Sequence, residues 1–360
     1  MSLSPELAAE LEQASKPFIE SKGAITAEHT RMKSWRYFLE INSACNLRCP
    51  TCTKGNMDGY DHKTGLMDME LMEKILDKIK AENPNAIVFT YGNSEPFLHP
   101  KLPECIAAIK RRGLHPEMST NLNHLQRVEE TLEAGPDLII ISLSGWTQEV
   151  YEKGHAGGKI EKVKDNMRIL AEANNARPNR VSILVNYHVY KDNQHEIPLM
   201  KEYALNLGLG FFTSYARAIS MENAIQYCRD KDPQATPFAV QEGSPDWNHA
   251  LPPVGDTYKQ AMERLIIPPT KAREMYQQWP MLKACPISHM FSFIRHDGKI
   301  SLCACVADRR ITLGNYLDLS QDERIVKRHD HSICQQCLSH RLSYYFHLVG
   351  DQKEWTPVLT

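Results

Sequence analysis

Short apolar runs alternate with helical patterns through the first 216 residues of the chain. Six runs have the apolar and β-branched composition that is typical of strands, and they span residues 37–43, 86–92, 114–120, 137–145, 180–190 and 210–216. Stretches with helical periodicity separate them, near residues 68–83, 101–112, 124–134, 147–174 and 194–207. Strands that alternate with helices are typical of parallel sheets with right-handed crossovers. The pattern therefore predicts an α/β fold, a partial (βα)6 TIM-like barrel of parallel strands.

The rest of the chain does not follow this alternation. A proline-rich stretch after the barrel has short helices predicted near 220–228 and 256–266, and we interpret it as a linker or a substrate-covering insertion. The chain begins with the pattern of an amphipathic helix, with Ser4 as N-cap and Pro5 in the first turn. We expect an N-terminal helical extension, the barrel, the linker or insertion, a small cysteine-rich domain and a C-terminal tail, at residues 1–35, 36–216, 217–280, 281–345 and 346–360.

Composition and charge narrow the classes of function. The chain has 360 residues with 42% hydrophobic residues and a formal net charge of −2, which argues against a basic nucleic-acid-binding surface. No apolar run approaches the ~20 residues that span a membrane, and the start of the chain lacks the apolar core of a signal peptide. We therefore expect a cytoplasmic protein that binds neither nucleic acid nor membrane. Ten cysteines in a reducing compartment indicate metal binding or catalysis rather than disulfides.

Three of these cysteines lie within eight residues, directly after the first predicted strand. They are Cys45, Cys49 and Cys52, in a loop where a barrel presents its active-site residues. A cubane iron–sulfur cluster normally takes four thiolates, so three leave one iron open to an outside ligand. The amino and carboxylate groups of an amino acid can chelate such an iron. The alternatives are a structural zinc site, which requires four closed ligands, and ordinary buried thiols.

The loop after the second predicted strand is a candidate for binding a small molecule. It contains Gly92, Asn93, Ser94 and Glu95, and small residues of this kind let a backbone approach a ligand closely. The alternative is an ordinary strand-to-helix loop that ends at Pro96. Weaker candidates lie at or near the ends of later strands, where the barrel mouth is expected: Ser119, Thr120, Asn121, Ser142, Ser144, Asn186 and His188. Among these, Asn121 and Ser142 are the ones we favour.

A second group of cysteines lies near the C-terminus. The runs 291–295 and 299–302 flank a turn at His296-Asp297-Gly298, which predicts a hairpin. Four thiolates can ligate a second cluster completely, and a zinc ribbon follows the same logic; the four candidates are Cys285, Cys303, Cys334 and Cys337. Cys305 either replaces Cys303 as a ligand or stays a free thiol, because cysteines two apart in a strand face the same side.

The Cys-x3-Cys-x2-Cys motif after the first strand of such a chain resembles the radical S-adenosylmethionine superfamily. The resemblance covers roughly residues 36–216 and implies that Cys45, Cys49 and Cys52 ligate a [4Fe–4S] cluster. It further implies reductive cleavage of S-adenosylmethionine to a 5′-deoxyadenosyl radical. The segment from Gly92 to Pro96 resembles the family's Gly-Gly-Glu-Pro segment, which receives the ammonium group of S-adenosylmethionine. One departure is Thr51, where the family usually has an aromatic residue.

The C-terminal cysteines resemble the auxiliary-cluster domains called SPASM and Twitch, in the shorter Twitch version. This implies an auxiliary [4Fe–4S] cluster that accepts an electron, in a radical oxidoreductase or maturase that abstracts hydrogen from a small molecule or peptide. The residues before the barrel look too short for a leader-binding domain, which favours a small molecule. A one-electron donor such as flavodoxin or ferredoxin is expected. The alternatives are redox-neutral radical modification of a peptide, with Cys305 as the candidate catalytic residue, and a non-catalytic iron–sulfur or zinc scaffold.

Overall fold

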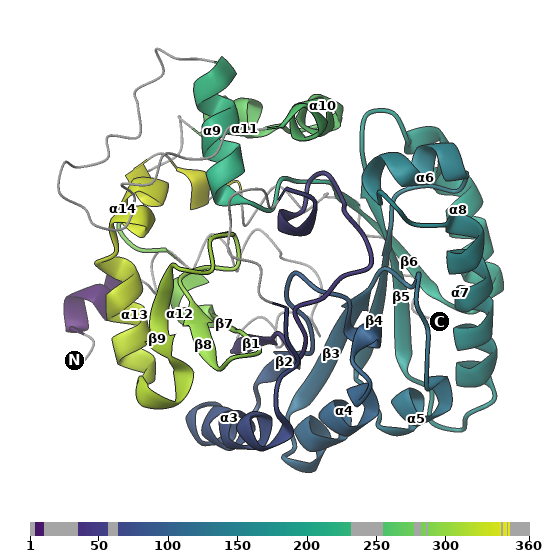
Figure 1. The fold of residues 1–360 in the computed structure, drawn as a ribbon, viewed down its shortest axis with the longest axis horizontal. Coiled ribbons are helices and arrows are strands. Elements are labelled where there is room, and N and C mark those ends of the chain that lie inside the picture. The colour runs from purple at the N-terminus through teal and green to yellow at the C-terminus, as the bar shows by residue number, and fades with distance from the viewer. Residues whose placement is uncertain are drawn as a thin grey trace.

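One curved sheet organises the molecule. The computed structural model describes residues 4–10, 35–56, 64–231, 255–276, 282–285, 287–339, 341–343 and 345. Within them, nine strands form a single sheet in the order β6-β5-β4-β3-β2-β1-β7-β8-β9. Figure 1 shows this sheet curving without closing, with helices along its outer side. The predicted partial barrel is confirmed.

The first six strands are parallel and adjacent in chain order. Each pairs with the next along the chain, for example Tyr37 with Val88 and Ile141 with Val185. They are β1 (Arg36–Leu39), β2 (Ile87–Phe89), β3 (His115–Thr120), β4 (Leu138–Leu143), β5 (Ser182–Val189) and β6 (Gly210–Tyr215). All six lie within the predicted runs, apart from one residue at the start of β1. The carboxyl ends of the parallel strands therefore meet at one rim, where loops carry function in barrels.

Helices cover the outer face of the six strands (Figure 1). They are α3 (Met69–Glu82), α4 (Leu102–Arg111), α5 (Val128–Glu133), α6 (Gln148–Gly154), α7 (Ile160–Asn175) and α8 (Ile197–Asn206). The prediction of one helix over 147–174 was wrong, because the chain breaks between α6 and α7. In the turn between them, Gly157 adopts a φ of +84°, a left-handed conformation through which an α-helix cannot continue.

Successive side chains of β1 point alternately to the hydrophobic core and to the interior of the barrel. Tyr37 and Leu39 are fully buried in the hydrophobic core that α3 helps to form. Phe38 points to the opposite face, where its ring stacks on Phe89 of β2 with centroids 4.6 Å apart. Phe293 stacks on the other side at 6.0 Å. The inner face of the barrel is therefore aromatic next to β1.

The C-terminal segment continues the same sheet. Its strands are β7 (Phe291–Ile294), β8 (Lys299–Ser301) and β9 (Thr312–Asn315), and β7 pairs with β1 in parallel while β8 and β9 follow antiparallel. The predicted hairpin is confirmed, with Gly298 at a φ of +76° in its turn. We had expected Cys303 and Cys305 to lie in a strand. This was wrong, because β8 ends at Ser301.

The remaining helices lie beside β7–β9 and beyond the rim of the barrel (Figure 1). They are α9 (Met221–Lys231), α10 (Asp256–Arg264), α11 (Pro269–Tyr276), α12 (Ile287–Met290), α13 (Gln321–His329) and α14 (Ser332–Ser339). Near the N-terminus, the Ser4 hydroxyl accepts a hydrogen bond from Leu7 N, as its predicted cap role requires. No helix in the described part of the chain is both long and apolar enough to cross a membrane.

Candidate functional site

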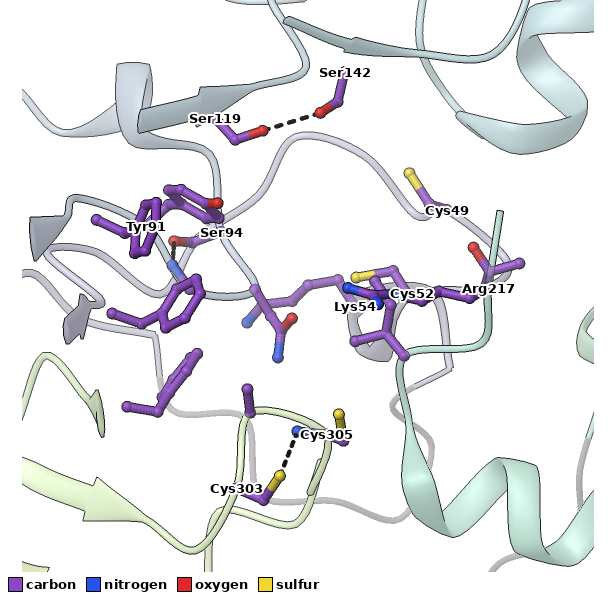
Figure 2. A pocket seen from close by; sticks show the side chains of 18 of the residues that line it. Cys49, Cys52, Lys54, Tyr91, Ser94, Ser119, Ser142, Arg217, Cys303 and Cys305 are labelled. Atoms are coloured by element: carbon purple, nitrogen blue, oxygen red, sulfur yellow. Dashed lines mark hydrogen bonds between the residues drawn. The ribbon is translucent and has the colours of Figure 1, made fainter. Parts of the chain in front are cut away.

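A cavity of about 630 Å³ lies at the rim of the barrel. Figure 2 shows Cys49 and Cys52 on one side of it and Cys303 and Cys305 on the other. Cys45, Cys285 and Cys334 also line it, and Cys337 is buried with only 7% of its surface exposed. Two groups of cysteines more than 230 positions apart in the sequence therefore share one cavity.

The first cysteine loop is held in shape by its own backbone. Cys52 N donates to Cys49 O at 3.0 Å, and a short 3-10 helix (Thr53–Gly55) follows directly. Gly55 packs so closely on this loop that a Cβ there would lie 2.1 Å from the carbonyl oxygen of Cys49. The loop therefore requires glycine at 55, a residue that the sequence analysis missed. The sequence offers no sign of this close approach beyond a glycine three positions after the last cysteine.

The three thiols of this loop suit a positively charged partner. Burial raises the pKa of Cys45 to about 11, and burial followed by the neighbouring thiols Cys52 and Cys45 raises the pKa of Cys49 well above its usual value. No three His, Cys, Asp or Glu side chains among the described residues converge closely enough to hold a single metal ion. In a four-iron cluster each cysteine thiolate binds a different iron. The cysteine sulfur atoms therefore surround the cluster and do not converge on one point. The donor set fits such a cluster.

Glu95 ties three loops of the rim together. Its side chain is 1% exposed, and its carboxylate accepts hydrogen bonds from Thr120 Oγ1 at 2.7 Å and from Asn121 N at 2.8 Å. Its backbone carbonyl accepts from Asn42 Nδ2, next to the cysteine loop. Burial raises the pKa of Glu95 to about 7 although the hydrogen bonds oppose the shift. Glu95 lines the cavity, and its backbone carbonyl and carboxylate together connect the segments that follow β1, β2 and β3.

The residues before Glu95 line the same cavity. Gly92, Asn93 and Ser94 all contribute to its wall, and the Ser94 hydroxyl lies 3.5 Å from Gly92 N. A Cβ on Gly92 would lie 2.4 Å from the ring of Phe293, so the close approach of β7 requires glycine at this position. Packing against Phe293 of the C-terminal segment therefore accounts for the glycine at position 92.

The strand-end candidates also reach this cavity. Asn121 Nδ2 donates to Asn46 Oδ1 at 2.9 Å and lies 3.8 Å from Cys45 Sγ. Ser142 shares a hydrogen bond of 2.9 Å with Ser119 across two strands, which Figure 2 marks by a dashed line. Both line the cavity, together with Asn186 and His188. Ser144, in contrast, is fully buried against His155 Nδ1 at 2.7 Å.

Thr51 occupies the position where an aromatic residue was expected. Its hydroxyl lies 3.5 Å from the hydroxyl of Tyr190, which follows β5, and both side chains line the cavity. Tyr190 and Arg217 are cavity residues that the sequence analysis did not single out. No pattern marks them, because each follows a strand whose position relative to the cysteine loop depends on how the sheet curves.

The C-terminal cysteines are assembled from separate segments. Cys303 and Cys305 lie in a turn after β8, with Cys305 N 3.5 Å from Cys303 Sγ. The hydrogen bond between the two thiols lowers the pKa of Cys303 and raises that of Cys305. Burial, followed by the neighbouring thiols Cys285 and Cys303, raises the pKa of both Cys334 and Cys337. Four thiols near one another are a donor set that fits a second cluster.

The start of α9 holds the turn that carries Cys303 and Cys305. Met221 N donates to Cys305 O at 2.7 Å. The carboxylate of Glu222, 2% exposed, accepts from Ala307 N at 2.8 Å and from Asp308 N at 3.1 Å. A segment that looked like a linker in the sequence therefore fixes the geometry of the second cysteine group.

Comparison with known proteins agrees with this geometry. The model of the Radical SAM superfamily matches residues 39–202. The chain is 30% identical over 273 residues to the tungsten-containing aldehyde ferredoxin oxidoreductase cofactor-modifying protein of Pyrococcus furiosus, covering 74% of this chain and 70% of that protein. The chain belongs to the radical SAM superfamily. It is an enzyme of that superfamily, whose cofactors are S-adenosylmethionine and a [4Fe–4S] cluster.

Two further similarities are more distant. The dTDP-4-amino-4,6-dideoxy-D-glucose ammonia-lyase of Streptomyces venezuelae is 30% identical over 159 residues, covering 42% of this chain and 32% of that enzyme. The crystal structure of Streptococcus suis SuiB bound to its precursor peptide SuiA matches with a TM-score of 0.51 at 12% identity. That match covers 86% of this chain and 68% of SuiB, and it shows a shared fold. The proteins that this chain is similar to therefore include one named for modification of a cofactor and, in fold, one bound to a peptide.

Proposed function

We propose that this enzyme abstracts a hydrogen atom from a substrate held between two iron–sulfur clusters and oxidises it. The observation that carries the proposal is the single cavity lined by both cysteine groups. When bound, the first cluster and S-adenosylmethionine supply a 5′-deoxyadenosyl radical, and a second cluster supplies an acceptor for one electron. The residues of the chain bind these groups, orient the substrate and exclude water.

Around the first cluster, the proposed ligands are Cys45, Cys49 and Cys52. Gly92, Asn93, Ser94 and Glu95 would bind the methionine end of S-adenosylmethionine, with Asn121 and Ser142 as further polar contacts. These side chains share the cavity with the three thiols, which supports the assignment. Glu95 is already held by Thr120 and Asn121, so its orientation is fixed before any ligand binds.

For the second cluster, the proposed ligands are Cys285, Cys303, Cys334 and Cys337, with Cys305 outside the set. Residues 281–345 would form the auxiliary unit, and residues 217–280 would connect it to the barrel. The contacts of α9 with the turn at Cys305 favour a role for residues 217–280 in holding that turn. An external one-electron donor such as flavodoxin or ferredoxin would reduce the first cluster.

The substrate is proposed to be a small molecule rather than a long peptide. The cavity of about 630 Å³ would also hold S-adenosylmethionine beside the first cluster, so the space left for a substrate suits a small molecule better than a long peptide. The relative from Pyrococcus furiosus is named for modification of a cofactor, which favours the same class. The fold shared with peptide-bound SuiB keeps a short peptide as the alternative substrate.

Formation of 5′-deoxyadenosine tests the proposal. Wild-type protein, reduced without oxygen, should cleave S-adenosylmethionine, and Cys49→Ala should lose this activity completely because one iron loses its thiolate. Cys228→Ala is the matched control, since Cys228 is buried and lies outside the cavity lining. Retained cleavage by Cys49→Ala contradicts the proposal, and calorimetry with S-adenosylmethionine that detects no binding to wild type would indicate a scaffold protein.

A second candidate function is redox-neutral, with Cys305 returning a hydrogen atom to the substrate. The observation that favours it is that Cys305 lines the cavity beside the proposed ligand Cys303. The S–H bond would break, the substrate would gain a C–H bond, and the thiyl radical would need one electron and one proton before the next turnover. A Cys305→Ala variant that forms product at the wild-type rate eliminates this candidate.

A further inference from the structure

Arg328 is a buried arginine whose hydrogen bonds reach segments that carry cysteines of the second group. It lies in the last turn of α13, is 5% exposed and lines the cavity. Its guanidinium donates hydrogen bonds to three backbone carbonyls: Nε to Leu302 at 2.9 Å, and Nη1 to Ser288 at 2.8 Å and to Phe291 at 3.0 Å. Leu302 directly precedes Cys303. Arg328 therefore joins the segments that carry three of the cysteines.

No carboxylate forms an ion pair or hydrogen bond with Arg328 among the described residues. Arg324, one helical turn earlier, shows the ordinary arrangement: its guanidinium binds both carboxylate oxygens of Glu82, at 3.0 and 2.8 Å. Carbonyl oxygens satisfy the hydrogen bonds of Arg328 but do not neutralise its charge. Burying an unneutralised cation costs free energy, so the fold implies an anion nearby.

The groups that act electrostatically on Arg328 identify that anion. They are the thiols of Cys303, Cys334 and Cys285, while Arg324 acts in the opposite direction. Four thiolates on a four-iron cluster give the whole assembly a net negative charge, and reduction makes it more negative. The charge of Arg328 would stabilise the reduced form more than the oxidised form, because net charge and hydrogen bonding set the potentials of such clusters.

We propose that Arg328 is a positioning residue whose positive charge retains the second iron–sulfur cluster and raises its reduction potential. The proposal rests on the proposed function, because it requires that the cluster binds at these cysteines. Arg328 would thereby make this cluster a better electron acceptor for the substrate. Its three hydrogen bonds reach two cysteine-bearing segments, the one that follows Cys285 and the one that precedes Cys303, and they hold the charge in place.

The test is a redox titration, followed by electron paramagnetic resonance, of protein in which Cys45, Cys49 and Cys52 are all alanine. Only the second cluster remains in this background. Arg328→Met should lower the equilibrium constant for its reduction at least tenfold, which is about 59 mV for a one-electron couple. Arg328→Lys keeps the charge but loses the forked hydrogen bonds, so its potential should stay closer to that of the background protein. Arg324→Met is the control, since it removes a buried arginine from the same helix whose charge is already paired with Glu82.

Each outcome decides between the proposals. A potential that does not move in Arg328→Met, with iron content unchanged, overturns the role of Arg328 and leaves the second cluster standing. Absence of iron from the background protein overturns both. If Arg328→Met loses iron while Arg328→Lys and Arg324→Met keep it, the result supports the proposal that the charge of Arg328 retains the cluster. Equal loss from Arg328→Met, Arg328→Lys and Arg324→Met would mean that the arginine acts only as structural support, and it overturns the proposal.

Discussion

The two sides of the cavity bring cysteines together in opposite ways. On the barrel side, three cysteines lie within eight residues, and the loop is shaped by its own backbone and by Gly55. On the C-terminal side, four cysteines come from separate segments, and side chains such as Glu222 and Arg328 hold these segments. The first site thus rests mainly on local structure, with a few tertiary contacts such as Ile219 N to Thr51 O, and the second depends on tertiary contacts. Changes distant in sequence should therefore damage the second site far more than the first.

Each side nevertheless relies on one buried carboxylate. Glu95 accepts from Phe97 N, Thr120 and Asn121 N, and Glu222 accepts from Ser220, Ala307 N and Asp308 N. Burial raises the pKa of both groups. Both carboxylates accept hydrogen bonds from loop backbones. Removing one of them therefore tests whether its own loop, rather than the whole fold, depends on these hydrogen bonds.

The largest effect is expected for Gly55→Ala. The added Cβ would overlap the backbone of Cys49, so the first loop must rearrange. The variant should lose the iron of the first cluster and all formation of 5′-deoxyadenosine, while the second cluster stays. Gly255→Ala is the control, because a Cβ there meets nothing within 4 Å. Full activity of Gly55→Ala would show that the loop does not need this close approach.

Glu222→Ala should damage the opposite side. It leaves buried N–H groups of Ala307 and Asp308 without an acceptor, at about 1–3 kcal/mol for each group. We expect the second cluster to lose its iron while the first cluster still cleaves S-adenosylmethionine. Glu222→Gln, which keeps one acceptor oxygen, should lie between. Equal loss of iron from both sites would remove the distinction between local and tertiary assembly.

A smaller effect concerns the pH dependence of folding. Because burial raises the pKa of Glu95 to about 7 in the folded state, the protein binds more protons folded than unfolded between about pH 4.5 and 7. The contribution of Glu95 to stability is therefore present below pH 4.5 and is lost as pH rises through 7, by roughly 3 kcal/mol. Denaturant titrations of wild type and Glu95→Gln across this range should diverge. Parallel curves would mean that Glu95 titrates normally.

The smallest effect is expected for Tyr190→Phe. Its hydroxyl makes a long contact with Thr51, so the loss should be about 0.5–1 kcal/mol of unfolding free energy. Both cysteine groups should keep their iron. Binding of S-adenosylmethionine, measured by calorimetry, should change by no more than a few fold. A large loss of affinity would assign Tyr190 to the cofactor site.

The sequence predicted what depends on neighbouring residues. The strands from β1 to β6 follow from their apolar runs, and the first cysteine loop follows from its spacing. The break between α6 and α7 was missed because Gly157 matters through its backbone conformation rather than through hydrophobic pattern. Cys303 and Cys305 were expected in a strand, but β8 is short and ends in a turn that α9 holds. Glu222 and Arg328 carry no motif, since their roles arise only when distant segments pack together.

A count of iron and sulfide per chain tests the central claim most directly. Protein purified without oxygen should contain about eight irons, and the variant with Cys45, Cys49 and Cys52 changed to alanine should contain about four. That result places one cluster at each cysteine group on the shared cavity. About four irons in wild type and none in the variant, with zinc present, would contradict the account. It would make the C-terminal cysteines a structural zinc site and leave the proposed oxidation without its electron acceptor.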